Sequence, residues 1–198
     1  EKAEEIGANC LQIFSSPPQR WQGSNHSADD LNRFRQKCQE SKLTPVFVHG
    51  TYLINLASDN SFLLDNSIKA LIDDLNFSHK IGAAGVIFHL GSHTGGVHSK
   101  LRDITDTLKL ILKSTPEDTQ IILENAAGSG NKIGGKLEEL ALLKNKTKNE
   151  RIRFCLDTQH AFAAGYDLRT KKDVDNFVNE IDQELGIENV VVFHVNDS

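Results

Sequence analysis

Residues 85–124, GVIFHLGSHTGGVHSKLRDITDTLKLILKSTPEDTQIILE, contain one complete strand-helix-strand pattern. Short apolar runs at both ends, Gly85–His89 and Gln120–Glu124, do not alternate apolar with polar residues. Continuous apolar strands are those buried on both faces, so these runs predict parallel strands covered by helices. Between them, Ser99–Lys113 places apolar residues at three- and four-residue intervals, which predicts an amphipathic helix. The stretch therefore predicts a β-α-β unit of a parallel sheet.

The same pattern recurs along the chain. The predicted strands are Cys10–Phe14, Pro45–His49, Gly85–His89, Gln120–Glu124, Arg153–Asp157 and Asn189–His194. The predicted helices are Ala28–Ser41, Ser61–Ile81, Ser99–Lys113, Leu137–Leu143 and Asp173–Leu185. The last five strands end at positions 49, 89, 124, 157 and 194, so successive steps are 40, 35, 33 and 37 residues. This even rhythm is typical of a (β/α)8 TIM barrel, and no Pro- or Ser-rich linker divides the chain. We predict a single partial TIM-barrel domain over residues 1–198.

A doubly wound α/β sheet is the structural alternative. Such a sheet usually carries G-x-G-x-x-G after its first strand. The nearest match, Gly128 to Gly134, has one residue too many and follows the fourth predicted strand. We interpret it as an ordinary glycine-rich loop, and no binding site for an organic cofactor is predicted.

Composition excludes several classes of protein. The 198 residues include 25% charged and 38% hydrophobic side chains, and no apolar run approaches the roughly 18 residues that cross a bilayer. The three cysteines are scattered and the N-terminus lacks a signal-peptide pattern, which predicts an intracellular, reducing compartment. The net charge of −5 argues against binding nucleic acid through bulk charge, so such binding would need local basic residues or bound cations. The sequence contains no Met, and we interpret it as a part of a longer chain.

Five successive predicted strands end in a side chain that can bind a metal ion or a proton. These residues are His49, His89, Glu124, Asp157 and His194, and His160 follows three positions after Asp157. The carboxyl ends of barrel strands meet at one face, where TIM-barrel active sites lie. Buried imidazole and carboxylate groups need partners, and a divalent cation is the simplest common one. Nitrogen and carboxylate ligands together favour zinc, manganese or iron over calcium or magnesium.

Several motifs resemble the endonuclease IV family of abasic-site DNA repair enzymes. They are HGTYLINLAS (49–58), FHLGSH (88–93), LENAAGSGNKIG (123–134), CLDTQHAFAAGYDLRT (155–170) and HVNDS (194–198). Together the matches extend from about Asn9 to Ser198. The resemblance implies a TIM barrel with up to three zinc ions that hydrolyses the phosphodiester 5′ to an abasic site.

The resemblance also implies roles for individual residues. His49, His89 and Glu124 would hold a first ion; Glu124, Asp157 and His194 a second; and His160 a third. Glu124 would be catalytic, because it would bridge two ions and orient the nucleophilic water.

Contact with DNA is expected in two loops. An abasic nucleotide must be extruded from the helix and the resulting gap filled. The resemblance assigns this to Tyr52 and Leu53, and places Gln19 and Arg20, just before Trp21, in a second DNA-contacting loop. The implied partner is double-stranded DNA containing abasic sites, with no membrane and no obligate protein partner. The expected location is cytoplasmic, and nucleoid-associated in a bacterium.

The chain also departs from the family pattern. An Asp-x-His pair and a late Glu, which the resemblance leads us to expect after His194, have no counterpart. The third metal site is therefore expected to lack ligands, and we count about six of eight β-α units, with the first and last strands missing. We expect such a chain to bind metal incompletely and to cut DNA poorly.

Two alternative functions remain open from the sequence. A metal-dependent sugar isomerase also carries His, Glu and Asp at the strand ends of a TIM barrel, although it more often has a Lys there and would not need Tyr52 and Leu53 in an exposed loop. The second alternative is a non-catalytic DNA-binding relative. The presence of all six expected ligands argues against a decayed site.

Overall fold

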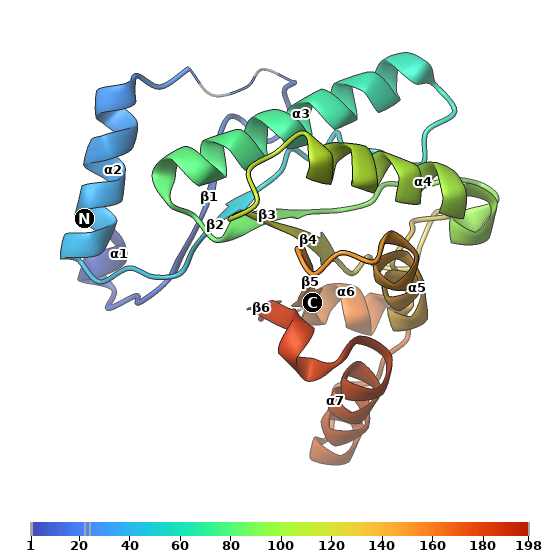
Figure 1. Cartoon of the computed structure of the whole chain (residues 1–198). Helices are drawn as coiled ribbons and strands as arrows, with labels where there is room; N and C mark the ends of the chain where they lie inside the picture. The colour runs from blue at the N-terminus through green and yellow to red at the C-terminus, as the bar shows by residue number, and fades with distance from the viewer. Residues whose placement is uncertain (1, 22, 24, 198) are drawn as a thin grey trace.

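Strands and helices alternate along the chain in the computed structural model, which describes residues 2–21, 23 and 25–197 (Figure 1). The strands are β1 (Leu11–Phe14), β2 (Val46–His49), β3 (Gly85–Phe88), β4 (Gln120–Glu124), β5 (Ile152–Asp157) and β6 (Val190–His194). The helices are α1 (Lys2–Glu5), α2 (Ala28–Glu40), α3 (Ser61–Ile81), α4 (Gly96–Lys113), α5 (Leu137–Thr147), α6 (Thr158–Ala163) and α7 (Lys171–Leu185), with a 3-10 turn η1 (Ile187–Asn189).

All six strands of the described chain lie parallel in one sheet, in the order β1-β2-β3-β4-β5-β6. Each strand therefore pairs with the next strand in the sequence, as in a barrel. A doubly wound sheet would instead reverse its strand order at a switch point. The register aligns Phe14 with His49, and Asp157 with His194, so neighbouring strands end at similar levels. The prediction of an incomplete (β/α)8 barrel is confirmed.

The two faces of the sheet carry different parts of the core. Val48 and Val86 belong to the large cluster that packs between the strands and the helices. Phe47, Ile87, Ile122 and Cys155 form a separate cluster on the opposite, concave face. Side chains alternate between the faces with a period of two residues. A residue two positions after a member of the inner cluster therefore also faces inward, at the carboxyl end of its strand.

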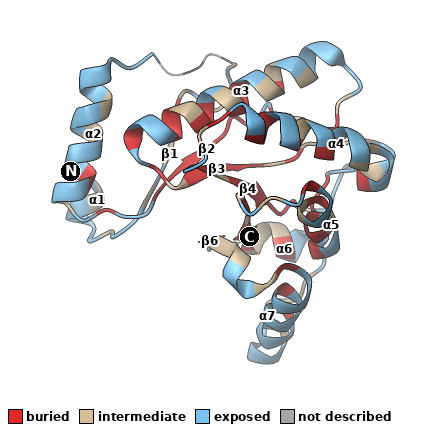
Figure 2. Cartoon of the chain, viewed as in Figure 1, coloured by how far each residue is buried: buried red, intermediate tan, exposed pale blue. Residues whose placement is uncertain are grey.

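Helix α3 shows how the local sequence sets an element. The Asn60 side chain accepts a hydrogen bond from Leu63 N (3.2 Å) at the first turn, and Gly82 ends the helix with φ 70°. Each is a common terminal signal, and an N-cap of this kind contributes about 1 kcal/mol. Figure 2 shows buried residues on the strands and on the inward side of α3 and α4, with an exposed outer surface.

Some predicted boundaries are wrong. Helix α4 starts at Gly96 rather than Ser99, α5 continues to Thr147, and Asn189 belongs to η1 rather than to a strand. A short helix, α6, follows β5 and contains His160, although it is not among the predicted helices. It forms because the Asp157 side chain caps it by accepting from His160 N at 3.0 Å. In the described residues, the longest helices are not apolar enough to cross a membrane.

Candidate metal centre

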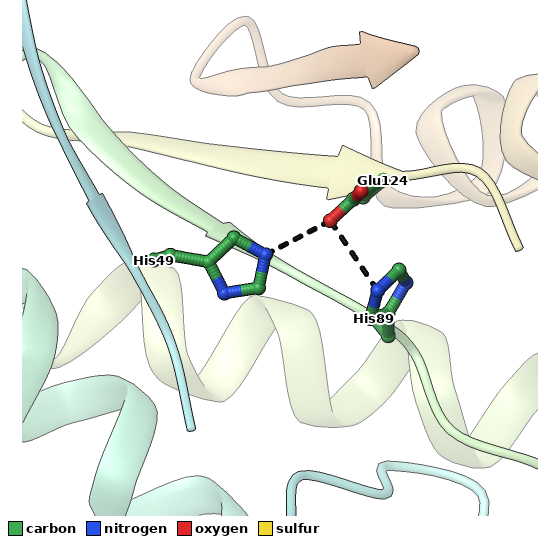
Figure 3. Close-up of side chains that lie close together, drawn as sticks. All are labelled: His49, His89 and Glu124. Atoms are coloured by element: carbon green, nitrogen blue, oxygen red, sulfur yellow. Dashed lines mark hydrogen bonds and ion pairs between the residues drawn. The ribbon is translucent and has the colours of Figure 1, made fainter. Parts of the chain in front are cut away.

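The strand-end side chains meet on the concave face of the sheet. His49, Glu124 and Asp157 end β2, β4 and β5, and each lies two residues after a member of the inner cluster. His89 directly follows β3, and His194 ends β6. In Figure 3, Glu124 lies between the imidazoles of His49 and His89, which come from neighbouring strands.

The Glu124 carboxylate is the centre of this group and is only 1% exposed. Its Oε2 lies 3.0 Å from Nε2 of His49 and 3.4 Å from Nε2 of His89. Its Oε1 lies 3.0 Å from Nδ1 of His194 and 3.5 Å from Nδ1 of His160. One buried carboxylate therefore lies within 3.5 Å of four imidazoles from four different segments.

Oxygen atoms outside this cluster determine how three of the imidazoles are oriented. Nδ1 of His49 lies 2.9 Å from the Gly50 carbonyl, and Nδ1 of His160 lies 3.0 Å from the Asn125 carbonyl. Nε2 of His194 lies 2.7 Å from Oε1 of Gln12. Since a carbonyl only accepts, each of these nitrogens donates. In His49 and His194 the other ring nitrogen faces Glu124, where it can bind a metal ion once it has lost its proton. Histidines that bind metals are commonly held in this way.

Burial and charge set the protonation states. Burial raises the pKa of Glu124, but hydrogen bonds from His194 and His49 and the charge of His89 outweigh it and hold this pKa well below its usual range. Burial lowers the pKa of His89 to about 4, although Glu124 opposes this. The hydrogen bond to Glu124 raises the pKa of His194. At neutral pH, Glu124 is ionised and His89 is neutral, which are the forms that bind metals.

The donor set fits divalent ions. Ligand atoms within 4.8 Å of one another form three groups: His49, His89 and Glu124; Glu124, Asp157 and His160; and Glu124, Cys155 and His194. In a tetrahedral zinc site with bonds of about 2.0–2.1 Å, neighbouring ligand atoms lie about 3.3 Å apart. The distances of 3.0 and 3.4 Å from Glu124 Oε2 to His49 and His89 are close to this value.

The grouping of the other predicted ligands differs in part from the expectation. Asp157 groups with Glu124 and His160, and its Oδ2 lies 3.8 Å from Nδ1 of His194. The other five predicted ligands nevertheless lie around Glu124. Their roles as metal ligands stay a prediction.

The residues predicted to contact DNA lie on two loops that are bonded to each other. Tyr52 N donates to the Pro18 carbonyl (2.8 Å), and the Tyr52 ring packs edge-on against Phe14 and His49. Tyr52 is 58% exposed and Leu53 37% exposed. Gln19 and Arg20 are exposed on the first loop. Their contact with DNA stays a prediction.

A cavity of about 590 Å³ lies beside the histidines. Its walls include His89 and His160 from the metal centre and Tyr52 and Leu53 from the exposed loop. The predicted DNA-contacting loop and the predicted metal centre therefore share one cavity.

Three residues of the centre were missed by the sequence analysis. Gln12 contacts His194, and the buried Cys155 groups with Glu124 and His194. Asn125 accepts from Asp157 N (2.6 Å) and donates to the Asp157 carbonyl (3.1 Å). Gln12 and Asn125 carry amide side chains that do not titrate, so a pattern of titratable strand ends does not include them. Their signal was local: Gln12 is the polar residue of an apolar strand, and Asn125 directly follows Glu124.

Known proteins resemble the chain along its whole length. Residues 1–198 match the family described as Xylose isomerase-like TIM barrel. A protein of Haloarcula marismortui named "Probable endonuclease 4" is 38% identical over 199 residues, which cover 100% of this chain and 71% of that protein. The crystal structure of endonuclease IV from Thermus thermophilus has a TM-score of 0.88 and 32% identity, with 100% of this chain and 70% of that chain covered.

A more distant structure shares the fold alone. A D-tagatose 3-epimerase-like protein has a TM-score of 0.78 but 18% identity, covering 100% of this chain and 70% of that one. The endonuclease relatives are about twice as similar in sequence. The chain therefore belongs to the endonuclease IV family, within the Xylose isomerase-like TIM barrels.

Proposed function

We propose that this protein is a zinc-dependent endonuclease that hydrolyses the phosphodiester 5′ to an abasic site in double-stranded DNA. The observation that carries the proposal is the buried Glu124 carboxylate, which lies among four imidazoles. Two of these imidazoles, His89 and His160, line a cavity that Tyr52 and Leu53 also border. The names of the two endonuclease relatives support the same reaction class.

The residues of the centre would have different roles in binding metal ions and in catalysis. His49, His89 and Glu124 would hold one zinc ion, and Asp157, His160 and His194 would hold further ions together with Glu124. When bound, such ions lower the pKa of water to near neutrality and neutralise charge on the attacked phosphate. The chain's own contribution is orientation. The rings of His49, His160 and His194 are oriented by oxygen atoms of Gly50, Asn125 and Gln12, respectively. Glu124 would accept a hydrogen bond from the attacking water.

Recognition of damage would come from the exposed loop. Tyr52 and Leu53 would enter the duplex and fill the gap that an extruded nucleotide leaves. Packing of Tyr52 against Phe14 and His49 holds its ring near the centre, so base-pair disruption and hydrolysis would occur side by side. Gln19 and Arg20 would contact the duplex from the neighbouring loop.

The first prediction concerns incision of a defined substrate. A 5′-labelled duplex with one tetrahydrofuran abasic analogue should be cut on its 5′ side, leaving a 3′-hydroxyl fragment on a denaturing gel. Incision should stop with 1,10-phenanthroline and return with added zinc. Glu124→Gln should reduce the rate by at least about 100-fold, because it removes the shared charge of the metal ligands.

The matched control is His79→Ala. His79 is an exposed histidine on α3 that pairs with Asp118, away from the centre. This variant and wild type should cut equally, and the undamaged duplex should stay intact. Incision that survives chelation, or a Glu124→Gln variant as active as wild type, would contradict the proposal.

Other outcomes would favour the alternatives. Binding of the tetrahydrofuran duplex without incision in the presence of zinc would support a non-catalytic DNA-binding protein. Zinc- or manganese-dependent epimerisation of a ketose, followed by NMR, would support the sugar isomerase. A genomic DNA substrate places the proposed activity inside the cell, at the nucleoid in a bacterium, and the reaction needs no protein partner.

A further inference from the structure

The cavity beside the metal centre carries one side chain with a fixed positive charge. Lys132, in the loop between β4 and α5, lines it together with His89 and His160. None of the described residues that line the cavity is an aspartate or a glutamate. The side chains that line the cavity therefore include a positive charge and no negative one, although the chain as a whole has a net charge of −5. A site of this kind attracts an anion.

The ammonium group of Lys132 has no hydrogen bond or ion pair with any described residue. Some other lysines of the chain are paired: Lys100 contacts Asp59 (2.5 Å) and Asp103 (3.2 Å), and Lys144 donates to the Ile152 carbonyl (2.9 Å). Lys132 differs from the remaining unpaired lysines in that it lines the cavity beside His89 and His160. A lysine without a carboxylate partner, at the wall of a cavity, keeps all three donors for a ligand.

The backbone of Lys132 is held against the opposite wall of the cavity. Lys132 forms an isolated antiparallel bridge with Ser92, and Ile133 N donates to the Gly91 carbonyl at 3.0 Å. Gly91 itself has a φ of 98°, and a Cβ there would overlap Oδ1 of Asn55, so the loop after β3 requires glycine at this position. The loops after β3 and β4 are thus joined, and the root of the Lys132 side chain is fixed beside His89.

We propose that Lys132 is a specificity-determining residue that binds the phosphate of the extruded abasic nucleotide. The inference rests on the proposed function and adds a residue to it. Phosphate is the anionic group of a DNA strand, whereas deoxyribose is neutral, so the phosphate is the partner that matches an ammonium group. Only a nucleotide that has left the helix could reach the cavity and gain binding energy from this contact. Lys132 would therefore increase discrimination between damaged and intact DNA, in addition to affinity.

The test measures binding without cleavage. The 198-residue chain, treated with a chelator so that the DNA stays intact, is titrated into fluorescein-labelled duplexes with and without one tetrahydrofuran. Lys132→Ala should weaken binding of the tetrahydrofuran duplex about 3- to 10-fold at low salt, as expected for one charge-assisted contact. The slope of the plot of log Kd against log salt concentration should decrease in magnitude by about 0.9, the contribution of one phosphate contact. Binding of the undamaged duplex should not change.

Chemical removal of the phosphate charge identifies the contact. A neutral methylphosphonate replaces the phosphate on the 5′ or the 3′ side of the tetrahydrofuran, one at a time. At one of the two positions, the neutral linkage should weaken binding by wild type by the same factor as the Lys132→Ala substitution does on the unmodified tetrahydrofuran duplex. The affinity of the Lys132→Ala variant should not decrease further with that linkage. Lys132→Arg should restore most of the binding, and the control Lys80→Ala, an exposed lysine at the carboxyl end of α3, should behave as wild type.

The outcomes separate this inference from the proposed function. If wild type does not prefer the tetrahydrofuran duplex, damage recognition itself is contradicted. If wild type prefers it and Lys132→Ala binds equally well, only the role of Lys132 is overturned. An equal loss on damaged and undamaged duplexes would show a general backbone contact and would also overturn the assignment.

Discussion

The most constrained residue of the molecule is Glu124. Four imidazoles contact a carboxylate that is almost fully buried, and burial alone would favour its neutral form. The hydrogen bonds from His194 and His49 reverse this preference and keep the pKa well below its usual range. A buried charge is stable only with such partners. Their removal one at a time is therefore expected to cost both metal affinity and stability.

Asp74 is a second buried carboxyl, away from the strand ends. It lies on α3 with 6% exposure and accepts a hydrogen bond from the Ser15 hydroxyl, just after β1. Burial raises its pKa to about 6, with the Ser15 hydrogen bond opposing the shift. The bond joins α3 to the start of the loop that contains Gln19 and Arg20.

The Asp74 carboxyl makes stability depend on pH. Its pKa is higher in the folded than in the unfolded chain, so the folded state holds more protons between about pH 4 and 6. Stability from this group is present below about pH 4 and is lost as the pH rises through 6. Asp74→Asn should remove the loss and be more stable than wild type at pH 8, by up to about 3 kcal/mol. Urea unfolding with chelator at about pH 4.5 and 8 measures the difference.

The control for this prediction is Asp65→Asn, because Asp65 is exposed on the same helix. Its effect on the free energy of unfolding should be the same at both pH values. A difference between Asp74→Asn and wild type that does not grow between the two pH values would contradict the assignment.

At the scale of elements, the ends of β4 and β5 are joined by one side chain. Asn125 directly follows β4 and is buried, and its amide bonds both the N–H and the carbonyl of Asp157 at the end of β5. The same Asp157 caps α6. Asn125 therefore positions the carboxyl end of β5 and the first turn of α6 relative to Glu124.

Loss of the Asn125 amide should destabilise the chain. Asn125→Ala removes one bond to the Asp157 carbonyl and leaves the buried Asp157 N–H without its acceptor, and an unsatisfied buried group of this kind costs about 1–3 kcal/mol. We expect a decrease of about 2–4 kcal/mol in the free energy of unfolding, measured with urea in the presence of chelator. The control Asn76→Ala, which removes a side-chain bond to the Ile72 carbonyl on α3, should cost below about 1 kcal/mol. Equal effects of the two variants would show that the bridge between the strands is energetically unimportant.

At the scale of the molecule, the candidate centre links distant parts of the sheet. Its ligands come from β2, β4, β5, β6, the residue after β3, and α6. Ions bound there would add further bonds among these segments, several of which are far apart in the sequence. Metal binding is therefore expected to stabilise the whole described sheet rather than one loop.

Metal removal should lower the thermal stability. Zinc at about 100 times its Kd stabilises the folded state by about 2.7 kcal/mol, which corresponds to roughly 5–10 °C in Tm for a chain of this size. Differential scanning calorimetry with zinc and with chelator measures the shift. His49→Ala should lose most of it, while the exposed His79→Ala should retain it. An identical Tm with zinc and with chelator would contradict a metal centre.

Much of the fold follows from local patterns. The apolar runs around Gly85–His89 and Gln120–Glu124 become strands, and the three- and four-residue periodicity becomes α3, α4 and α7, because burial of apolar surface depends on the spacing of neighbouring residues. The element that these patterns do not predict is short: α6 depends on a cap from Asp157, and a helix of six residues is too short to show an apolar periodicity.

The sequence by itself determined the six strands and the longer helices, that the strands form a parallel barrel-type sheet, and which titratable residues lie at the strand ends. Only the tertiary structure decided that Glu124 is the shared centre, that Gln12 contacts His194, and that Lys132 faces a cavity beside His89. The physical reason is distance along the chain: Glu124 and His49 are separated by 75 residues, and Gln12 and His194 by 182. Local spacing sets the face of each strand, whereas contacts between such distant residues depend on strand register and packing.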